Sequence, residues 1–210
     1  MLIFNSLLNI ADDLSNFPVE ITDLFIQCFS ELSVQSPVIA SLLSMVYKSN
    51  KVFPALVVEK LTANLYQTIQ KDDVQVAKLL LRALAGLASS NCVLLTGPNS
   101  VLSLLDALNG ITESSWIRDV VDSAERSTLD HQGQVTAFLV ATTIPWVISA
   151  VNLSSTDQSE AAVVLKRILK SCERVCSEWR SPFEVDGQQA LFHVGIQHAT
   201  DCVDVDSIAG

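Results

Sequence analysis

The chain has 210 residues, of which 49% are hydrophobic and 17% charged, and its formal net charge at pH 7 is −10. This composition excludes intrinsic disorder as a description of the whole chain, because so many apolar residues can build a core. The negative charge opposes direct binding to nucleic acid, since phosphates carry the same sign. Aromatic residues make up only 6%, which favours helices packed on helices over a β-sandwich.

Three helices are expected in the first fifty residues. The first is a short helix over residues 3–14. The second begins at Pro18, because proline is tolerated in a first helical turn, and its apolar face continues to Leu32. The third begins at Pro37 and carries apolar side chains at a spacing of three and four residues as far as Tyr47.

The middle of the chain predicts two longer helices. Residues 53–70 carry an apolar side chain every four positions and polar side chains between them, which indicates an amphipathic helix. Residues 74–88 form the next predicted helix, with Asp72 or Asp73 as its N-cap.

A glycine- and proline-containing break at residues 97–100 supplies cap residues for a shorter helix, which is expected to end at Gly110. The break is no phosphate-binding loop, since it lacks the second glycine followed by Lys and Ser or Thr. Residues 111–131 are polar and are expected to form a long connection that includes one loose helical turn.

The last third of the chain predicts two helices and an acidic segment. An apolar helix is expected over residues 134–151, where Pro145 should kink or divide it. Another helix is expected after Asp157, as far as about Trp179. Residues 181–210 are acidic and less regular, and are expected to be mostly mobile.

These elements predict an all-α fold. Helices joined by short turns, without a strand pattern of comparable strength, indicate a right-handed solenoid of stacked antiparallel helical hairpins of the HEAT and armadillo kind. We expect one helical-repeat scaffold domain over residues 1–180 and an acidic, flexible segment over residues 181–210.

Residues 132–156 contain no charged side chain and are long enough to cross a bilayer. Pro145 and several threonines interrupt this stretch, and no Lys or Arg brackets it closely. A central helix of a solenoid, covered on nearly all sides, has the same pattern. We expect that helix, and a membrane-anchored helical protein remains an alternative.

The five cysteines include no CxxC pair, which fits reduced thiols of an intracellular compartment. Cys172 and Cys176 are spaced four residues apart and are expected to pack between helices rather than to bind a metal.

The three histidines do not indicate catalysis. His131 is expected to have a helix-cap role rather than an acid–base role, while His193 and His198 would be splayed apart by helical spacing. Motifs of serine hydrolases, zinc hydrolases and dinucleotide-binding enzymes do not occur. We therefore expect a protein that is not an enzyme, with no catalytic residue, no cofactor and no metal site.

One segment carries a family resemblance. Residues 137–147 resemble the hydrophobic helix that ends in Leu-Pro-Trp-Val in the large subunit of the nuclear cap-binding complex, with Ile144 where that family usually has Leu. Pro145 and Trp146 are the most specific part, and the Trp146 ring is expected to be buried. The preceding order of helices, including Ala-Lys-Leu-Leu-Leu-Arg at residues 77–82, is also similar.

The resemblance covers roughly residues 10–180 and has departures. Ile148 replaces a glycine often found after the motif, and residues 118–126 lengthen the usual loop. The family's large subunit has three helical-repeat domains, and this chain has the length of one.

The resemblance implies the first helical-repeat domain of that subunit, of the type named after the middle domain of initiation factor 4G. That family is a nuclear scaffold that can shuttle to the cytoplasm. It pairs with a small RNA-recognition-motif subunit, which holds the 7-methylguanosine cap, and links capped mRNA to splicing, export and nonsense-mediated decay. The large subunit does not stack the cap, so contact with capped RNA would be indirect. An unrelated armadillo or HEAT-type adaptor remains the alternative.

Overall fold

The computed structural model describes residues 14, 16–32, 35–121, 124–151 and 158–178. These residues form seven helices and one two-stranded antiparallel hairpin, so the expected all-α class is confirmed for them apart from the hairpin. The predicted helix over residues 3–14, except Leu14, and the acidic segment 181–210 lie outside the described residues.

The chain divides into two compact units, Met1–Leu94 and Leu95–Gly210. The predicted single scaffold domain over residues 1–180 stays a prediction.

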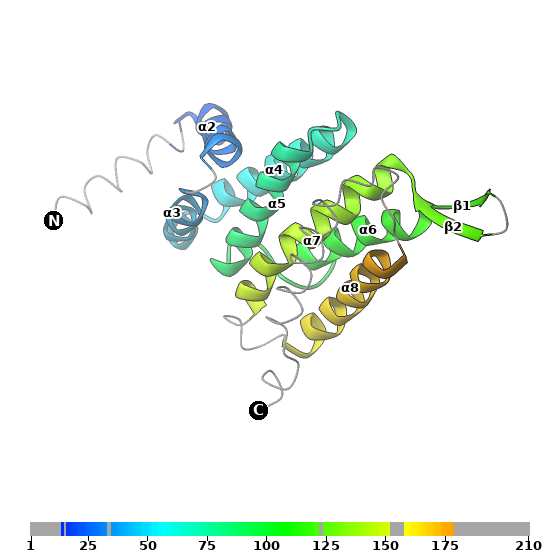
Figure 1. Ribbon diagram of the computed structural model, residues 1–210. Coiled ribbons are helices and arrows are strands. Elements are labelled where there is room, and N and C mark those ends of the chain that lie inside the picture. The colour runs from blue at the N-terminus through cyan, green and yellow to red at the C-terminus, as the bar shows by residue number, and fades with distance from the viewer. Residues whose placement is uncertain (1–13, 15, 33–34, 122–123, 152–157, 179–210) are drawn as a thin grey trace. The chain divides into compact units, whose positions relative to one another are not determined.

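The first unit contains four described helices (Figure 1). They are α2 (Pro18–Glu31), α3 (Ser36–Ser49), α4 (Val52–Gln70) and α5 (Val74–Ser89). Each of them packs against its neighbour in the chain, and α2 also packs against α4 as α3 does against α5. Contact between every second helix is what stacking one helical hairpin on the next produces.

Local side chains explain where these helices begin. Pro18 and Pro37 lie in the first turns of α2 and α3, as the sequence predicted. The Asn50 Oδ1 atom accepts hydrogen bonds from the amides of Val52 and Phe53 at 3.0 and 3.1 Å. Asp73 caps α5, because its side chain accepts a bond from the Val76 amide at 3.2 Å, which confirms one of the two predicted caps.

The core of the first unit is made of the apolar stripes of these helices. Val57, Leu61 and Leu65 are fully buried, so the predicted amphipathic pattern of α4 is confirmed. Burial of each such side chain stabilises the fold by about 1.5–3 kcal/mol. Other large side chains that are fully buried in this unit are Phe29, Leu43, Leu80, Leu81 and Leu87.

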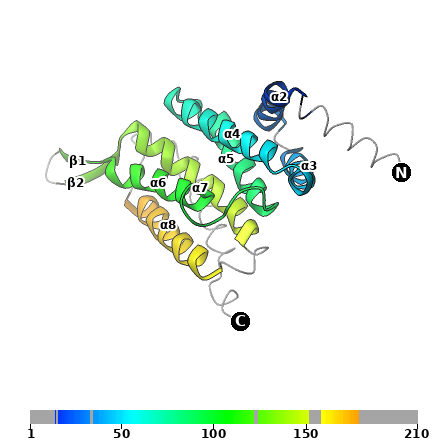
Figure 2. The same cartoon turned by 180° about the vertical axis from the view of Figure 1, so that it is seen from behind.

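The second unit contains α6 (Val101–Ser114), the strands β1 (Trp116–Val121) and β2 (Ala124–Leu129), α7 (His131–Val151) and α8 (Gln158–Glu178). Helices α6, α7 and α8 pack against one another, and the hairpin extends from the end where α6 is followed by α7 (Figures 1 and 2).

The expected end of a helix at Gly110 is wrong, because α6 continues for one further turn to Ser114. The buried stripe explains this extension: Leu105, Leu108 and Thr112 face the core on both sides of the glycine. The packing offsets the cost of placing a glycine inside a helix, which is about 1 kcal/mol relative to alanine. The Ser100 side chain caps α6 by accepting from the Ser103 amide at 3.1 Å, as the break at residues 97–100 predicted.

The expected long connection over residues 111–131 is also wrong. Its first residues extend α6, and the rest forms an antiparallel hairpin whose register pairs Trp116 with Leu129 and Val121 with Ala124. Trp116 packs against a buried cluster of Leu129, Ala137 and Val175, which attaches the base of the hairpin to α7 and α8.

Helix α7 runs through Pro145 as one element, so of the two expected effects of this proline, a kink or a division, the division does not occur. Ile144 and Val147 are fully buried. Trp146 is partly buried rather than fully buried, so the expectation of a buried residue at this position is not met in full.

Within the described residues, no helix combines the length and the apolar character that a membrane span requires.

A buried polar contact ties α6 to α7. The hydroxyl oxygens of Thr112 and Thr136 lie 2.9 Å apart and share a hydrogen bond. Thr136 also donates toward the carbonyl oxygens of Gln132 and Gly133 in its own helix. The bond between the two threonines satisfies polar groups that would otherwise be costly to bury at a helix–helix contact.

Candidate functional site

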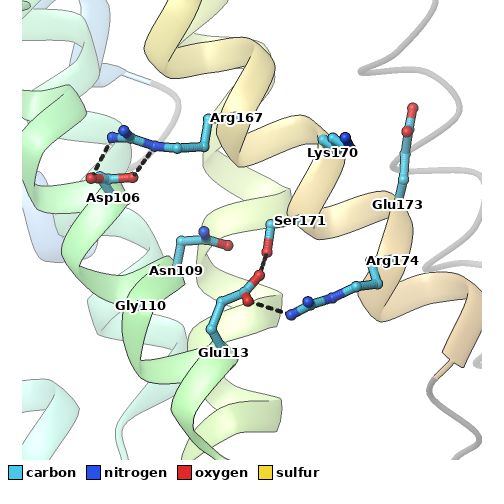
Figure 3. A pocket seen from close by; sticks show the side chains of 9 residues that line it. All are labelled: Asp106, Asn109, Gly110, Glu113, Arg167, Lys170, Ser171, Glu173 and Arg174. Carbon is cyan, nitrogen blue, oxygen red and sulfur yellow. Dashed lines mark hydrogen bonds and ion pairs between the residues drawn. The ribbon is translucent and has the colours of Figure 1, made fainter.

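A polar groove between α6 and α8 is the candidate site in the second unit. It has a volume of about 750 Å³, and Figure 3 shows the side chains that line it. They comprise three acidic, three basic and three uncharged residues: Asp106, Glu113, Glu173, Arg167, Lys170, Arg174, Asn109, Gly110 and Ser171. The formal charges of the lining therefore cancel, although the chain as a whole is strongly acidic.

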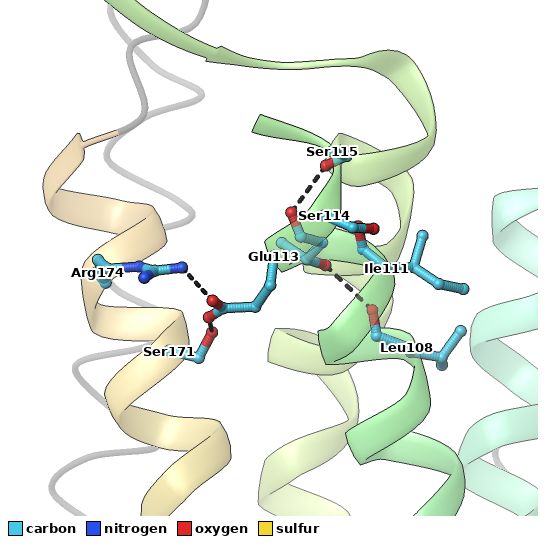
Figure 4. Close-up of polar contacts among 8 residues, drawn as sticks. Leu108, Ile111, Glu113, Ser114, Ser115, Ser171 and Arg174 are labelled. Atoms are coloured by element: carbon cyan, nitrogen blue, oxygen red, sulfur yellow. Dashed lines mark hydrogen bonds and ion pairs between the residues drawn. The ribbon is translucent and has the colours of Figure 1, made fainter. Parts of the chain in front are cut away.

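Two arginine–carboxylate pairs bridge the helices. Arg167 donates from Nε to Asp106 Oδ1 at 3.1 Å and from a terminal nitrogen to Oδ2 at 2.6 Å. The Glu113 carboxylate accepts hydrogen bonds from both Ser171 and Arg174 (Figure 4). The bidentate contact with Asp106 fixes the Arg167 head group in one orientation.

The two pairs also define the direction of the helices. Asp106 and Glu113 are seven residues apart on α6, and their partners Arg167 and Arg174 are seven residues apart on α8. Because the residue numbers increase in the same direction along both helices, α6 and α8 run parallel. A separation of seven residues along a helix is about 10 Å, so the pairs stand at two levels of the same groove.

A smaller hollow of about 320 Å³ adjoins the groove near the start of α6. Asp106 and Arg167 line both hollows, so this pair marks where they meet. The smaller hollow is also lined by Thr96, Gly97, Pro98, Ser100 and Glu160. Together the two hollows follow the α6–α8 contact.

Asn109 lies in the groove between the levels of the two ion pairs. The residue as a whole is 8% exposed, and Figure 3 shows its amide directed toward α8. Its amide atoms are not among the side-chain atoms of the described residues that are completely buried without a hydrogen-bond partner. The next residue, Gly110, has nothing within 4 Å of the place where a side chain would begin, so the approach beside the amide is open.

The first unit has an exposed apolar stripe on α3. Val38, Leu42 and Met45 are spaced by four and three residues and therefore share one face. Val38 is 70% exposed and Met45 50% exposed. Contiguous exposed apolar side chains are typical of surfaces that contact other proteins.

Two cationic side chains on α5 are partly removed from water. Burial lowers the pKa of Lys78, and the nearby Arg82 guanidinium lowers it further. Burial also lowers the pKa of Arg82. Desolvation disfavours the charged form of a base, which accounts for both directions.

The residues singled out from the sequence lie elsewhere. Pro145 and Trp146 are on α7, and neither lines the groove. His131 is the exposed first residue of α7, but the cap is Asp130, whose carboxylate accepts from the Gly133 amide at 2.7 Å. Cys172 is buried, as expected, while the Cys176 side chain and the C-terminal histidines lie outside the described residues.

Among the described residues, no three His, Cys, Asp or Glu side chains are grouped so that they could hold a metal ion.

Sequence reasoning missed Asn109 and the pairing of α6 with α8. One signal was present: Asn109 is a polar residue that directly follows Leu108, one of the leucines of the apolar face of this helix. The ion pairs join residues 61 positions apart in the chain, and no local pattern identifies such partners.

A scan against models of known protein families gives no match to this chain, and a search of curated proteins gives none either.

Proposed function

We propose that this chain is a scaffold that works through protein–protein contacts, built as a right-handed solenoid of stacked helical hairpins. The observation that carries the proposal is the packing order: α2 packs against α4, α3 against α5, and α6 against α8. The parallel course of α6 and α8 supports it, because equivalent helices of successive hairpins run in the same direction. Stacks of this kind present extended surfaces to protein partners.

We further propose that the scaffold belongs to the nuclear mRNA cap-binding complex and acts in mRNA processing, export and decay. Support for this pathway comes from the resemblance of residues 137–147, including Pro145 and Trp146, to the large subunit of that complex. In this proposal, the partners are mRNA-processing and export proteins, and capped RNA is contacted indirectly. In this proposal, the chain acts in the nucleus and can shuttle to the cytoplasm.

Three features support a binding role over catalysis. The α6–α8 groove is occupied by arginine–carboxylate pairs that neutralise one another. The exposed stripe of Val38, Leu42 and Met45 suits a protein contact. The net charge of −10 disfavours direct contact with the RNA backbone.

Quantitative affinity purification of the tagged full chain tests the proposal. The expected result is enrichment of splicing, export and decay factors that bind capped transcripts, relative to an unrelated helical-repeat protein of similar size and charge. Adding a cap analogue to the extract should leave direct protein partners bound. Recovery of trafficking or cytoskeletal proteins alone would assign the chain to the unrelated adaptors instead.

A further inference from the structure

The helices α2 and α3 carry apolar side chains that are exposed to solvent. On α3 they form the stripe of Val38, Leu42 and Met45. On α2 they include Leu24 and, seven residues earlier, the N-cap residue Phe17, which shares the same face of the helix. Large apolar side chains that are exposed together favour a contact that covers them.

The exposed side chains of both helices point away from α4 and α5. Ala40 on α3 is buried beside α5, where its Cβ atom lies 3.8 Å from the place that a Gly86 Cβ would take. Leu42 is two residues after Ala40, so it lies on the opposite side of α3. On α2, Leu24 is likewise two residues before the buried Ile26. In a stack of helical hairpins, this is the side on which a preceding element packs.

The segment that precedes α2 has a matching apolar side. Residues 1–11 contain no charged side chain and seven large apolar ones. Leu14 is helical and only 4% exposed, and it ends the helix that the sequence predicts over residues 3–14. The apolar residues that share a face with Leu14 at helical spacing are Ile3, Leu7 and Ile10. The side of this predicted helix that is buried at its described end is therefore the apolar side.

We propose that residues 1–13 pack on the exposed apolar side of α2 and α3, so that this segment and a protein partner compete for the stripe of α3. The lengths fit, because a helix over residues 3–14 is about 18 Å long and the stripe from Val38 to Met45 spans about 10 Å. Only residues 15–17 separate the predicted helix from the start of α2. This short connection holds the segment beside the stripe at a high effective concentration, an advantage that a second copy of the chain lacks.

Charge favours this occupant over the acidic segment 181–210. Helix α3 contains a single charged residue, Lys48, which lies in its last turn. The stripe therefore gives a segment with several carboxylates almost nothing to pair with. The uncharged residues 1–11 have apolar side chains that such a surface removes from water.

The inference rests on the proposed scaffold role for its competing partner, but its first test needs no partner. A photo-reactive benzoylphenylalanine replaces Val38 in the full chain, where the exposed position tolerates a larger side chain. Irradiation and peptide mass spectrometry should link position 38 to residues 1–13 of the same molecule. A mixture of isotopically heavy and light chains should give no heavy–light products. The matched control carries the probe at Tyr66, an exposed residue of α4 in the same unit, and should not give this link.

Substitutions in the segment test its apolar side. Leu7→Ser combined with Ile10→Ser should reduce the yield of the link about tenfold or more, because the apolar contact is lost. Asn5→Ser is the control, since residue 5 lies on the opposite side of the predicted helix. In affinity purification, the double variant should recover several times more of the protein partners than Asn5→Ser does, because the stripe is uncovered.

Three crosslinking results would overturn the inference: no link to residues 1–13, heavy–light products in place of links within one molecule, or a yield that the double variant leaves unchanged. Equal recovery of partners by both variants would overturn the competition. Failure of the scaffold proposal has a different signature. In that case no variant recovers a partner, while the link between position 38 and residues 1–13 is still formed.

Discussion

Gly133 lies where the first turn of α7 meets the end of α6, and the space there is too small for a side chain. A Cβ atom at this position would overlap the Ser115 hydroxyl oxygen and lie 2.7 Å from Ser115 Cβ. Ser115 cannot move freely, because its hydroxyl donates to the Thr112 carbonyl oxygen at 2.8 Å. The close approach therefore requires glycine.

We expect Gly133→Ala to lower the free energy of unfolding by about 1–3 kcal/mol, as overpacking does. Gly110→Ala is the matched control. No atom lies within 4 Å of its added Cβ, so this change should raise stability by about 0.5–1 kcal/mol through helix propensity. Urea denaturation of both variants measures the difference, and equal effects of the same sign would contradict the close packing at Gly133.

We expect the Cys92 thiol to be alkylated more slowly than a free cysteine thiol. Burial raises the pKa of its thiol, so less of the reactive thiolate is present at pH 8 than in a free thiol. Because the raised pKa favours the protonated form in the folded state, its contribution to stability is lost as pH rises through the folded-state pKa. Alkylation by iodoacetamide, followed by peptide mass spectrometry, should be slower at Cys92 than in N-acetylcysteine. A rate equal to that of N-acetylcysteine would contradict the assigned burial.

The ion pairs between α6 and α8 should orient the side chains that line the groove more than they stabilise the second unit. The side chains of Arg167 and Asp106 are 60% and 36% exposed, and exposed pairs contribute only about 0.2–1 kcal/mol. A double-mutant cycle with Asp106→Asn and Arg167→Gln should give a coupling energy within that range, which decreases as salt increases.

The control for this cycle combines Asp106→Asn with Arg174→Gln. These residues stand at different levels of the groove, so their effects on the free energy of unfolding should be nearly additive. A coupling energy well above 1 kcal/mol for Asp106 and Arg167 would show that the pair is a main support of the second unit.

The helices were largely predictable from the sequence, and the hairpin was not. Helix α4 carries an apolar side chain every four residues and ends with a clear turn, so local pattern and packing agree. The segment from Trp116 to Leu129 has no regular apolar alternation. Its strands depend on pairing with each other and on the contact of Trp116 with Leu129, Ala137 and Val175, which no local pattern reveals.

Gly110 and Asn109 illustrate a second limit of local reasoning. A glycine after an apolar stripe is a common helix end, yet the buried stripe of α6 continues beyond it to Thr112. Asn109 could have been noted as a polar residue on that stripe. Its position in a groove could not be inferred, because the opposite wall belongs to α8, more than fifty residues later.

At the coarsest level, the composition of the chain predicted the helical fold class correctly. The abundance of apolar residues and the small number of aromatics predicted helices packed on helices, and the described residues form such packing in both units. The net charge of −10 carries no information about the fold, but it limits what the surface can attract. The negative charge therefore bears on whether the chain can bind the mRNA cap.

We expect the chain alone not to bind 7-methylguanosine appreciably. Cap recognition needs two aromatic rings that enclose a cationic purine and basic groups that bind the phosphates. Among the described residues, the large aromatic side chains that are more than half exposed are Phe17, at 54%, and Tyr66, at 52%. Phe17 precedes α2 and Tyr66 lies on α4, and the net charge of −10 opposes the triphosphate.

Titration of the full chain into a fluorescent cap analogue measures this binding. The expected curve shows no saturation at micromolar protein, while a small cap-binding subunit assayed in parallel should saturate. In the proposed role, the cap is held by that subunit, and this chain contributes surfaces for other proteins. Saturable binding that an unlabelled cap analogue reverses, and that guanosine triphosphate without the methyl group does not, would show that the chain reads the cap itself. The scaffold proposal would then have to be replaced by one in which this chain is the ligand-binding component.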